Sequence, residues 1–169
     1  MTIGFRDATT ADAPALDRLF KDVFCDTFAH LYRVEDLSAF LAQFTPRAWR
    51  AELSDPGYAF HLAEADSEAV GYAKLGPLKL PVDEARSAIL LSQLYVRQDH
   101  HGAGIAQHLM DWAFAEAKRR GKEQLYLTVF TENHRARRFY QRLGFEDVGP
   151  YAFMVGSQAD EDIIMRKAV

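Results

Sequence analysis

Two glycines that follow an apolar run are the residues best suited to ligand chemistry in this sequence. Gly102 and Gly104 stand in the stretch VRQDHHGAGIA, between an apolar segment that ends at Val96 and a helical pattern that begins at Ile105. Glycine lets a chain turn tightly and approach a ligand closely, and the start of a helix presents unpaired N–H groups and a positive dipole end. We therefore expect this loop to bind a phosphate-bearing ligand through its backbone amides.

The loop alone leaves the identity of that ligand open. A dinucleotide-binding fingerprint needs a third glycine where this chain has Gln107, and no Gly-Lys-Ser/Thr sequence follows to complete a P-loop. A tight strand-to-helix connection without any ligand is the alternative at this point.

A second pair of residues, Asn133 and Tyr140, is suited to contact the same ligand as the glycine loop. Asn133 and Tyr140 are seven residues apart on a predicted helix, close to two full turns, so their side chains share one face. That helix follows one predicted strand, and the glycine loop follows another. Parallel strands place their carboxyl ends together and ligands bind outside those ends, so we expect the loop and the helix to converge on one ligand.

Hydrophobic periodicity predicts the elements that position these residues within a single α/β (α+β) domain over 1–169. One helix carries the apolar residues of 16–24, a second helical region runs over 34–53 with an interruption at 45–46, a third begins at 105 and meets a stop signal at 118–121, and a fourth covers 133–143. The segment 87–130 should form a strand, helix, strand unit with a right-handed parallel crossover. Strands are expected at 3–6, 58–65, 69–76, 87–96, 124–130, 145–155 and 163–167.

Composition narrows the classes of partner. The chain has 169 residues, a formal net charge of −4 and a pI near 5.8, which argues against a nucleic-acid partner and slightly favours a cationic one. No apolar run is long enough to span a bilayer and the N-terminus lacks a signal core, so we expect a cytoplasmic protein without a membrane partner. The adjacent His100 and His101 have no spaced partner, so no metal site is predicted.

Two strings, LYVRQDHHGAGIAQHLM and TENHRARRFYQRLGFEDVG, resemble the acetyl-coenzyme A signature of the GNAT (GCN5-related) N-acetyltransferases. The family motif begins with Gln or Arg, where this chain has His101. Because the family binds the pyrophosphate through backbone amides, we expect this replacement to cost little. The resemblance implies a mixed, mostly antiparallel sheet of about seven strands, with a parallel and splayed pair formed by the fourth and fifth, flanked by about four helices.

The same resemblance implies acetyl-CoA as co-substrate, no metal, and roles for particular residues. The backbone of 94–96 would pair with the pantetheine arm, and Tyr140 would stand near the sulfur as the general acid. Arg138 lies in a row with Arg135 and Arg142 that either meets a cofactor phosphate or faces solvent. The cofactor-binding residues implied in this way are Leu94, Tyr95, Val96, His101, Gly102, Ala103, Gly104, Ile105, Ala106, Gln107, Asn133, Arg138 and Tyr140.

Further segments, DTFAHLY, VGYAKLGPLKLP and FMVGSQADEDIIM, are similar to the PaiA-like branch of this superfamily, bacterial acetyltransferases linked to polyamines such as spermidine. The likeness implies transfer of acetyl to the primary amine of a small molecule, by direct attack in a ternary complex, and a possible homodimer. The alternatives are a protein, peptide or aminoglycoside-type acceptor, a non-catalytic acyl-CoA sensor, and a dinucleotide-dependent oxidoreductase, which Gln107 disfavours.

The general base is left open by the sequence. A primary amine with a pKa near ~10.4 is almost wholly protonated at neutral pH, so a base or a water chain is required. The branch resemblance implies a Glu in the central strand, and this chain has Leu90 at the expected position. The segments that could face the acceptor offer four candidates, none of them in a strong motif: Asp26, His30, Tyr32 and His61.

Overall fold

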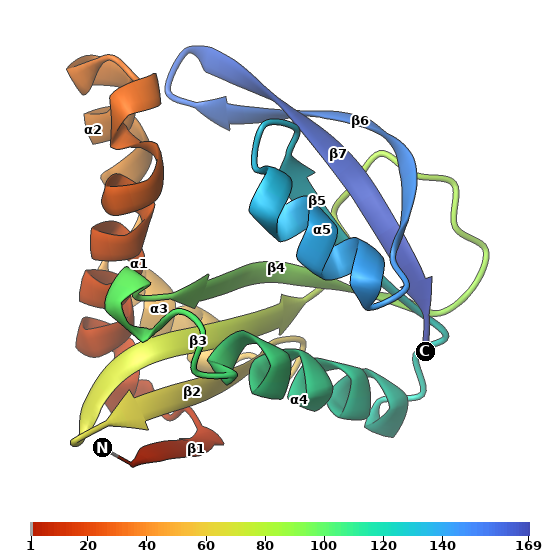
Figure 1. The fold of residues 1–169 in the computed structure, drawn as a ribbon, viewed down its shortest axis with the longest axis horizontal. Coiled ribbons are helices and arrows are strands. Elements are labelled where there is room, and N and C mark those ends of the chain that lie inside the picture. The colour runs from red at the N-terminus through yellow and green to blue at the C-terminus, as the bar shows by residue number, and fades with distance from the viewer. Residues whose placement is uncertain (1) are drawn as a thin grey trace.

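A seven-stranded sheet runs through the molecule in the order β1-β2-β3-β4-β5-β7-β6 (Figure 1). The computed structural model describes residues 2–169. Neighbouring strands are antiparallel except for β4 and β5, which are parallel, so the mixed sheet implied by the family resemblance is confirmed. The strands are β1 (Ile3–Asp7), β2 (Ala59–Ala65), β3 (Glu68–Gly76), β4 (Ala88–Val96), β5 (Gln124–Phe130), β6 (Glu146–Val155) and β7 (Gln158–Ala168).

Residues 2–169 form five α-helices, one more than expected. The additional helix arises because Pro46 starts a new helix after the interruption, and the Thr45 hydroxyl caps it by accepting a hydrogen bond from the Ala48 amide at 3.1 Å. Short 3-10 helices, η1 (Thr10–Asp12), η2 (Ala29–Leu31) and η3 (Gln98–His100), complete the connections. The α-helices are α1 (Ala13–Phe28), α2 (Val34–Leu41), α3 (Pro46–Leu53), α4 (Ile105–Arg119) and α5 (His134–Arg142).

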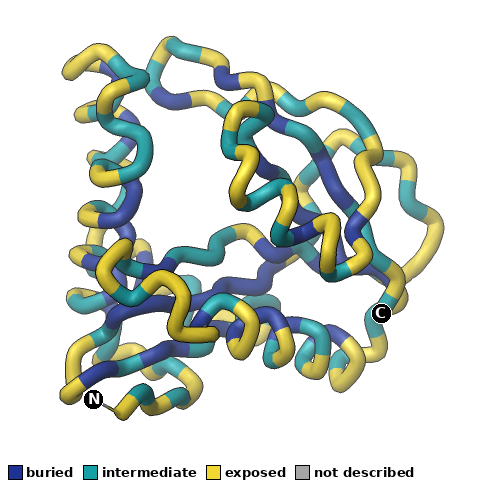
Figure 2. The backbone as a smooth tube through the Cα atoms, viewed as in Figure 1, coloured by how far each residue is buried: buried dark blue, intermediate teal, exposed yellow. Residues whose placement is uncertain are grey.

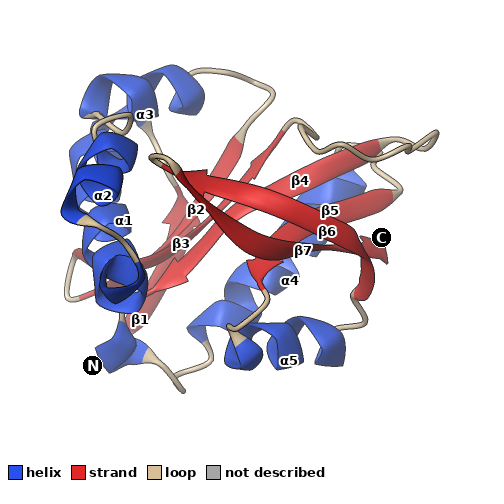
Figure 3. Ribbon diagram, turned by 90° about the horizontal axis from the view of Figure 1, so that it is seen from above, coloured by secondary structure: helices blue, strands red, loops and turns tan. Residues whose placement is uncertain are grey.

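The sheet separates two hydrophobic cores. Figure 2 shows the buried positions that the central strands and the helices contribute. On one face, α1, α2 and α3 pack with Phe60, Leu62 and Tyr72, and Figure 3 shows these three helices gathered on one side of the sheet. On the other face, α4 and α5 pack with alternate residues of the same strands, including Ala63 and Ala73. A side chain's place in the strand alternation therefore decides which face it reaches.

The last strand begins five residues earlier than the predicted 163–167 segment. Asp160 and Asp162 are buried and share one face of β7, whereas Ala159 before them and Glu161 between them are exposed. Aspartate is depleted in strands, and here it occupies the buried positions where the usual pattern has apolar residues. The sequence pattern therefore concealed the segment that turns out to line the cavity described below.

The tip of the β6–β7 hairpin is attached to α2, which Figure 1 shows beside it. The Asp36 carboxylate in α2 accepts hydrogen bonds from the Ser157 amide at 2.8 Å and from the Ser157 hydroxyl at 2.7 Å. Gly156 has a φ of +57°, and a Cβ atom at this position would lie 2.5 Å from the Asp36 Cα. This contact brings Phe40 of α2 within 5.8 Å of Phe153 of β6, measured between ring centroids.

Replacing Gly156 by Ala should therefore loosen the hairpin from α2. The left-handed backbone and the close approach to Asp36 predict a loss of about 2 kcal/mol or more in the free energy of unfolding, measured by urea denaturation. Gly4→Ala is the matched control, because nothing lies within 4 Å of its added Cβ, and its expected change is below ~0.5 kcal/mol. Equal effects of the two substitutions would contradict the attachment.

Candidate functional site

The two parallel strands stay together for only a short distance. Ala88, Ile89 and Leu90 of β4 pair with residues 124–126 of β5, and beyond them the strands separate. Along their other edges β4 stays paired with β3 as far as Val96, and β5 stays paired with β7 as far as Phe130. A wedge-shaped opening therefore lies inside the sheet, as the family resemblance implied.

A cavity of about 330 Å³ occupies this opening and reaches both faces of the sheet. Its lining includes Tyr140 and Ala136 from the α4–α5 core and Phe24 and Phe40 from the α1–α3 core. A register shift opposite Lys74 leaves β4 with one extra residue beside the opening. Such a bulge bends a strand and interrupts its ladder, which helps to turn β4 away from β5.

The glycine loop lies at the carboxyl end of β4, as predicted. Gly102 and Gly104 have φ values of +83° and +79°, both residues are exposed, and no atom lies within 4 Å of a Cβ added to either. The first amide to bond back within α4 is that of His108, to the Gly104 carbonyl, so the amides of the first turn have no partner within the helix. Backbone donors and open space thus occur together, as phosphate binding requires.

The other predicted loop residues have different environments. Ala103 is exposed, Ile105 is buried in the core, and Ala106 is partly buried. The Gln107 side chain donates a hydrogen bond to Asp111 along α4 at 2.9 Å. Only the backbone N–H of Gln107 is therefore available to the loop.

The His101 side chain has a structural role that the sequence did not predict. Its Nε2 atom lies 2.9 Å from the Val96 carbonyl oxygen, and its Nδ1 atom lies 2.6 Å from Nη1 of Arg135. A carbonyl only accepts and a guanidinium only donates, so this geometry requires a neutral ring with its proton on Nε2. The expectation that this residue is interchangeable is therefore incomplete, because His101 joins the end of β4 to α5.

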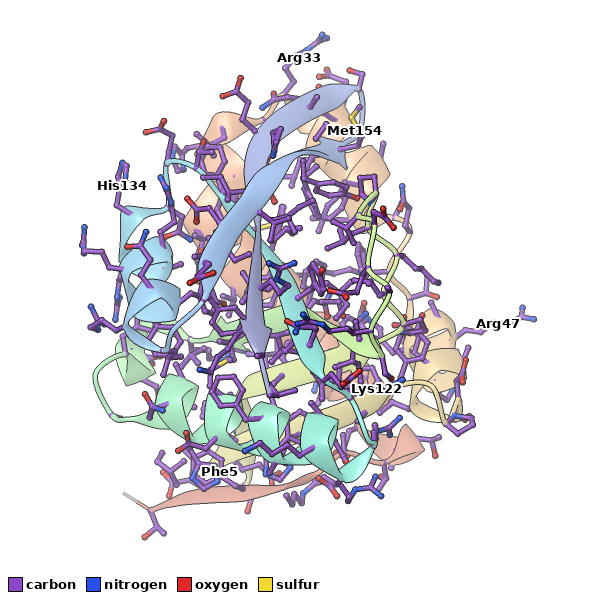
Figure 4. All side chains as sticks on the ribbon, turned by 90° about the vertical axis from the view of Figure 1, so that its right-hand side faces the viewer. Phe5, Arg33, Arg47, Lys122, His134 and Met154 are labelled. Atoms are coloured by element: carbon purple, nitrogen blue, oxygen red, sulfur yellow. The ribbon has the colours of Figure 1, made fainter. Side chains whose placement is uncertain are left out.

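Arg135 makes the side-chain contact between α5 and the loop, and the role of Arg138 in cofactor binding stays a prediction. Arg138 is exposed and takes no part in this contact. His134, at the start of the helix, is exposed and points outward from the sheet (Figure 4). Asn133 caps the helix by accepting a hydrogen bond from the Ala136 amide at 3.3 Å.

Asn133 and Tyr140 both line the cavity, as their spacing predicted. Tyr140 is 8% exposed and packs edge-on against Phe145, with 5.7 Å between the ring centroids. Burial raises the pKa of Tyr140 well above its ordinary value, because the charged phenolate would lose its hydration. The side chain is therefore a neutral hydroxyl throughout the physiological range. Of the predicted β4 residues, Leu94 and Tyr95 also line the cavity, whereas Val96 is buried beside it.

Two carboxylates face the cavity from β7, and no motif in the sequence points to either of them. Asp160 and Asp162 are 8% and 7% exposed, and both line the cavity. Asp160 accepts a short hydrogen bond from the Tyr32 hydroxyl and a second one from Gln158 Nε2 at 3.0 Å. The only cation that lines the cavity among residues 2–169 is Lys74, whose ammonium pairs with Glu52 at 3.0 Å.

Burial and the nearby negative charge of Asp160 raise the pKa of Asp162 to about 7, against a smaller opposing effect of a hydrogen bond from Thr128. Both causes disfavour the ionised form of a carboxyl group. The Asp162 side chain therefore changes its protonation near neutral pH.

Among the four candidate bases from the sequence, only Tyr32 lines the cavity. Asp26 and His30 are exposed, and His61 pairs with Asp7 at 2.7 Å and stacks on Trp112 of α4. The cavity wall on the side of α1 and α2 is otherwise largely aromatic. Its phenylalanines are Phe20, Phe24, Phe28, Phe40, Phe44, Phe130 and Phe153.

Residues 2–169 contain neither a candidate membrane-spanning helix nor a candidate metal-binding cluster. No helix of this part of the chain is long and apolar enough to cross a membrane. In the same residues, no group of three or more His, Cys, Asp and Glu side chains is arranged to hold a metal ion.

Comparisons with known proteins agree with this geometry. A sequence model of the acetyltransferase (GNAT) family matches residues 20–145. An uncharacterized N-acetyltransferase of Lactobacillus delbrueckii subsp. lactis is 26% identical over 165 residues, which cover 94% of this chain and 92% of that protein. The L-methionine sulfoximine/L-methionine sulfone acetyltransferase of Pseudomonas aeruginosa is 29% identical over 151 residues, 88% of this chain and 83% of that one.

A solved structure shares the fold over its whole length. The PaiA N-acetyltransferase of Thermoplasma acidophilum, in complex with coenzyme A, superposes with a TM-score of 0.80 and covers 100% of both chains at 21% identity.

The raised pKa of Asp162 predicts a pH-dependent loss of stability. The folded protein binds the Asp162 proton more tightly than the unfolded chain, so the free energy of unfolding falls as pH rises from about 4 to about 7 and then levels off. Asp162→Asn removes this effect. We expect it to raise the melting temperature by ~2–8 °C at pH 8, equivalent to ~1–2 kcal/mol, and by much less near pH 4. Thermal melts across this range measure the difference.

The matched control is Glu161→Gln, which removes an exposed carboxylate from the other face of the same strand. Its melting temperature should follow that of the unmodified protein at every pH. A gain for Asp162→Asn that is independent of pH would contradict the titration of Asp162 near neutrality.

Proposed function

The chain belongs to the acetyltransferase (GNAT) family and is an acetyl-CoA-dependent N-acetyltransferase, and we propose that its acceptor is a primary amine of a polyamine such as spermidine. The observation that carries the proposal is the single cavity through the sheet. It joins Tyr140 on the glycine-loop side to Asp160 and Asp162 on the aromatic side. An anionic co-substrate can therefore enter the cavity from one face of the sheet and a cationic acceptor from the other, so that the two meet inside it.

The residues at the carboxyl end of β4 fit acetyl-CoA. The loop over 102–104 offers open space, and the first turn of α4 offers unpaired amides for the phosphates. Arg135, at the edge of the loop, is placed to add a positive charge. Leu94, Tyr95 and Asn133 would line the path of the pantetheine arm. When bound, acetyl-CoA supplies the thioester whose carbonyl carbon the amine attacks and whose sulfur leaves.

We assign Tyr140 to the departing sulfur. A phenol with a pKa near ~10 is a weaker acid than a thiol near ~8.5, so complete proton transfer is uphill by roughly 2 kcal/mol in water. Burial in the cavity raises the pKa of Tyr140 further, and it would raise the pKa of a thiol in the same place for the same reason. The hydroxyl therefore acts chiefly as a hydrogen-bond donor that stabilises the negative charge as it develops.

The acceptor side favours an aliphatic cation. Asp160 and Asp162 have no ion-pair partner among the described residues, so a bound ammonium would supply the missing positive charge. Phenylalanine rings attract cations through their faces and also pack against methylene groups. A polyamine presents both kinds of surface, because its ammonium groups are separated by short hydrocarbon segments.

An α-amino acid is the second candidate acceptor, because the Pseudomonas relative is named for acetylation of such compounds. An amino acid would bring a carboxylate into the cavity beside Asp160 and Asp162, and Lys74 is already paired with Glu52. Repulsion between like charges in a buried site disfavours this arrangement. The homodimer expected from the family resemblance stays a prediction.

The acceptor proposal predicts a definite order of substrates in a thiol-release assay with acetyl-CoA. Spermidine and spermine should give the highest kcat/KM, ahead of lysine peptides, aminoglycosides and L-methionine sulfone, because only the polyamines lack an anionic or bulky polar group. A preference for peptides or for the sulfone would contradict the polyamine assignment. Tight calorimetric binding of acetyl-CoA without thiol release from any amine would instead indicate an acyl-CoA sensor.

Tyr140→Phe tests the role of the hydroxyl. Loss of a positioned proton donor should lower kcat by ~10²-fold or more, while the affinity for acetyl-CoA measured by calorimetry stays within about twofold. Tyr126→Phe is the control, since Tyr126 is another buried tyrosine whose hydroxyl donates to Glu84, outside the cavity, at 2.5 Å. Unchanged turnover of every accepted amine by Tyr140→Phe, over a full pH series, would refute the assignment.

A further inference from the structure

We propose that Asp162 is the base that takes the proton from the acceptor's ammonium group, and that Asp160 is the fixed anion that binds this group. The inference rests on the proposed acetyl transfer to an amine and supplies the base that the sequence left open. It concerns two residues of β7 that no motif in the sequence singled out.

The position of Asp162 suits a group that receives a cation. It lies opposite Phe130 of β5 and opposite Tyr151 of β6, on the sheet face that packs against α1 and α2. With only 7% of its surface exposed, it lines the cavity without any cationic partner in the described chain. A buried carboxylate without a counter-charge is costly, so the site is electrostatically incomplete until a cation enters.

The two aspartates differ in their hydrogen bonds. Both oxygens of Asp160 accept from the protein, Oδ2 from the Tyr32 hydroxyl and Oδ1 from Gln158. These donors fix the orientation of the Asp160 carboxylate, which makes Tyr32 a positioning residue. Among the described residues, Asp162 has only the Thr128 hydroxyl as a hydrogen-bonding neighbour. It is therefore the carboxylate that is free to accept a proton.

The charged and titratable groups around Asp162 support this division of roles. Among residues 2–169, Asp160 on the same strand is the only other acidic residue that lines the cavity, and the neighbouring elements contribute phenols. The phenols are Tyr32 after α1, Tyr95 on β4, Tyr140 on α5 and Tyr151 on β6. Burial raises the pKa values of Tyr32, Tyr95 and Tyr140, so these three stay neutral. The raised pKa of Asp162, about 7, places its own titration at the pH of the reaction.

The acceptor nitrogen loses two protons during the reaction, and Asp162 and Tyr140 assist from opposite sides of the sheet. The acceptor nitrogen begins as an ammonium with three protons and ends as an amide with one. Asp162 takes the first proton, which frees the electron pair for attack. The second proton leaves the nitrogen as the tetrahedral intermediate collapses and ends on the departing sulfur, whose developing charge the Tyr140 hydroxyl stabilises through its hydrogen bond. Asp162 then releases its proton to solvent, and one proton is produced for each acetyl group transferred.

The decisive variant is Asp162→Asn, which keeps the size of the side chain and removes the base. For spermidine at pH 7 we expect kcat/KM to fall by ~10²-fold or more. The ascending limb near pH 7 should disappear, and the rate should instead rise toward the pKa of the free amine. With 2,2,2-trifluoroethylamine, which is neutral at this pH, the variant should retain most of the activity that the unmodified enzyme shows.

Asp160→Asn should behave differently. Removing the neighbouring negative charge lowers the pKa of Asp162, so the ascending limb should move to lower pH, while KM for spermidine increases. Calorimetry with spermidine alone, without acetyl-CoA, should show weaker binding to both variants. Glu161→Gln is the control for both measurements, because its carboxylate is exposed on the other side of β7.

Each outcome separates the two assignments. If Asp162→Asn acetylates spermidine as fast as the unmodified enzyme at pH 7, Asp162 is not the base, and the acetyltransferase proposal stands. An equal loss with spermidine and trifluoroethylamine would also overturn the role as base, because a purely structural defect affects both amines. Absence of thiol release from every amine with the unmodified enzyme would overturn the proposed function and the role of Asp162 with it.

Discussion

The candidate site depends on the loss of hydrogen bonding between β4 and β5 after three paired residues. An intact parallel ladder would fill the centre of the sheet with backbone hydrogen bonds and leave no space there. Each strand instead keeps its partner on the outer edge, β3 for β4 and β7 for β5, so the opening removes pairing from only one edge of each strand. The sheet can therefore contain a passage and still hold together.

The passage brings together two environments that would otherwise be separated by the sheet. The glycine loop, Asn133 and Tyr140 lie on the side of α4 and α5, where amides and hydroxyl groups donate hydrogen bonds. Asp160 and Asp162 lie on the side of α1 and α2, where carboxylates accept them. The burial of two acids opposes folding, and the protein offsets it with a large aromatic core on the same face. If the two acids act as proposed, the protein loses stability in the place where its chemistry occurs.

Much of the fold follows from local patterns in the sequence. The alternation of the first hairpin, the apolar β4 segment and the four-residue steps of α4 are strong signals, and the elements there lie within one or two residues of their predicted ends. Asn133 and Tyr140 were predictable because their spacing depends only on helix geometry. The glycine loop was predictable because positive φ angles favour glycine.

The remaining features depend on contacts between segments that are distant in the sequence. Asp160 and Asp162 did not look like strand residues, because aspartate is rare in strands. Their burial follows from a cavity made with α1 and α2, which are distant in the sequence. The alternation of buried acids with Ala159 and Glu161 was the one available signal. The link from His101 to Arg135 joins residues 34 positions apart, so no local pattern distinguishes Arg135 from Arg138.

The attachment of α2 to the β6–β7 hairpin has an evolutionary consequence. The side that suits the co-substrate is built from one continuous stretch, from β4 to α5, whereas the side that faces the acceptor is assembled from the two ends of the chain. Insertions or substitutions in those ends can remodel the acceptor wall without altering the glycine loop. Two distant segments held together by Asp36 and Ser157 thus form an exchangeable module, through which new acceptors can be selected while the acetyl donor stays the same.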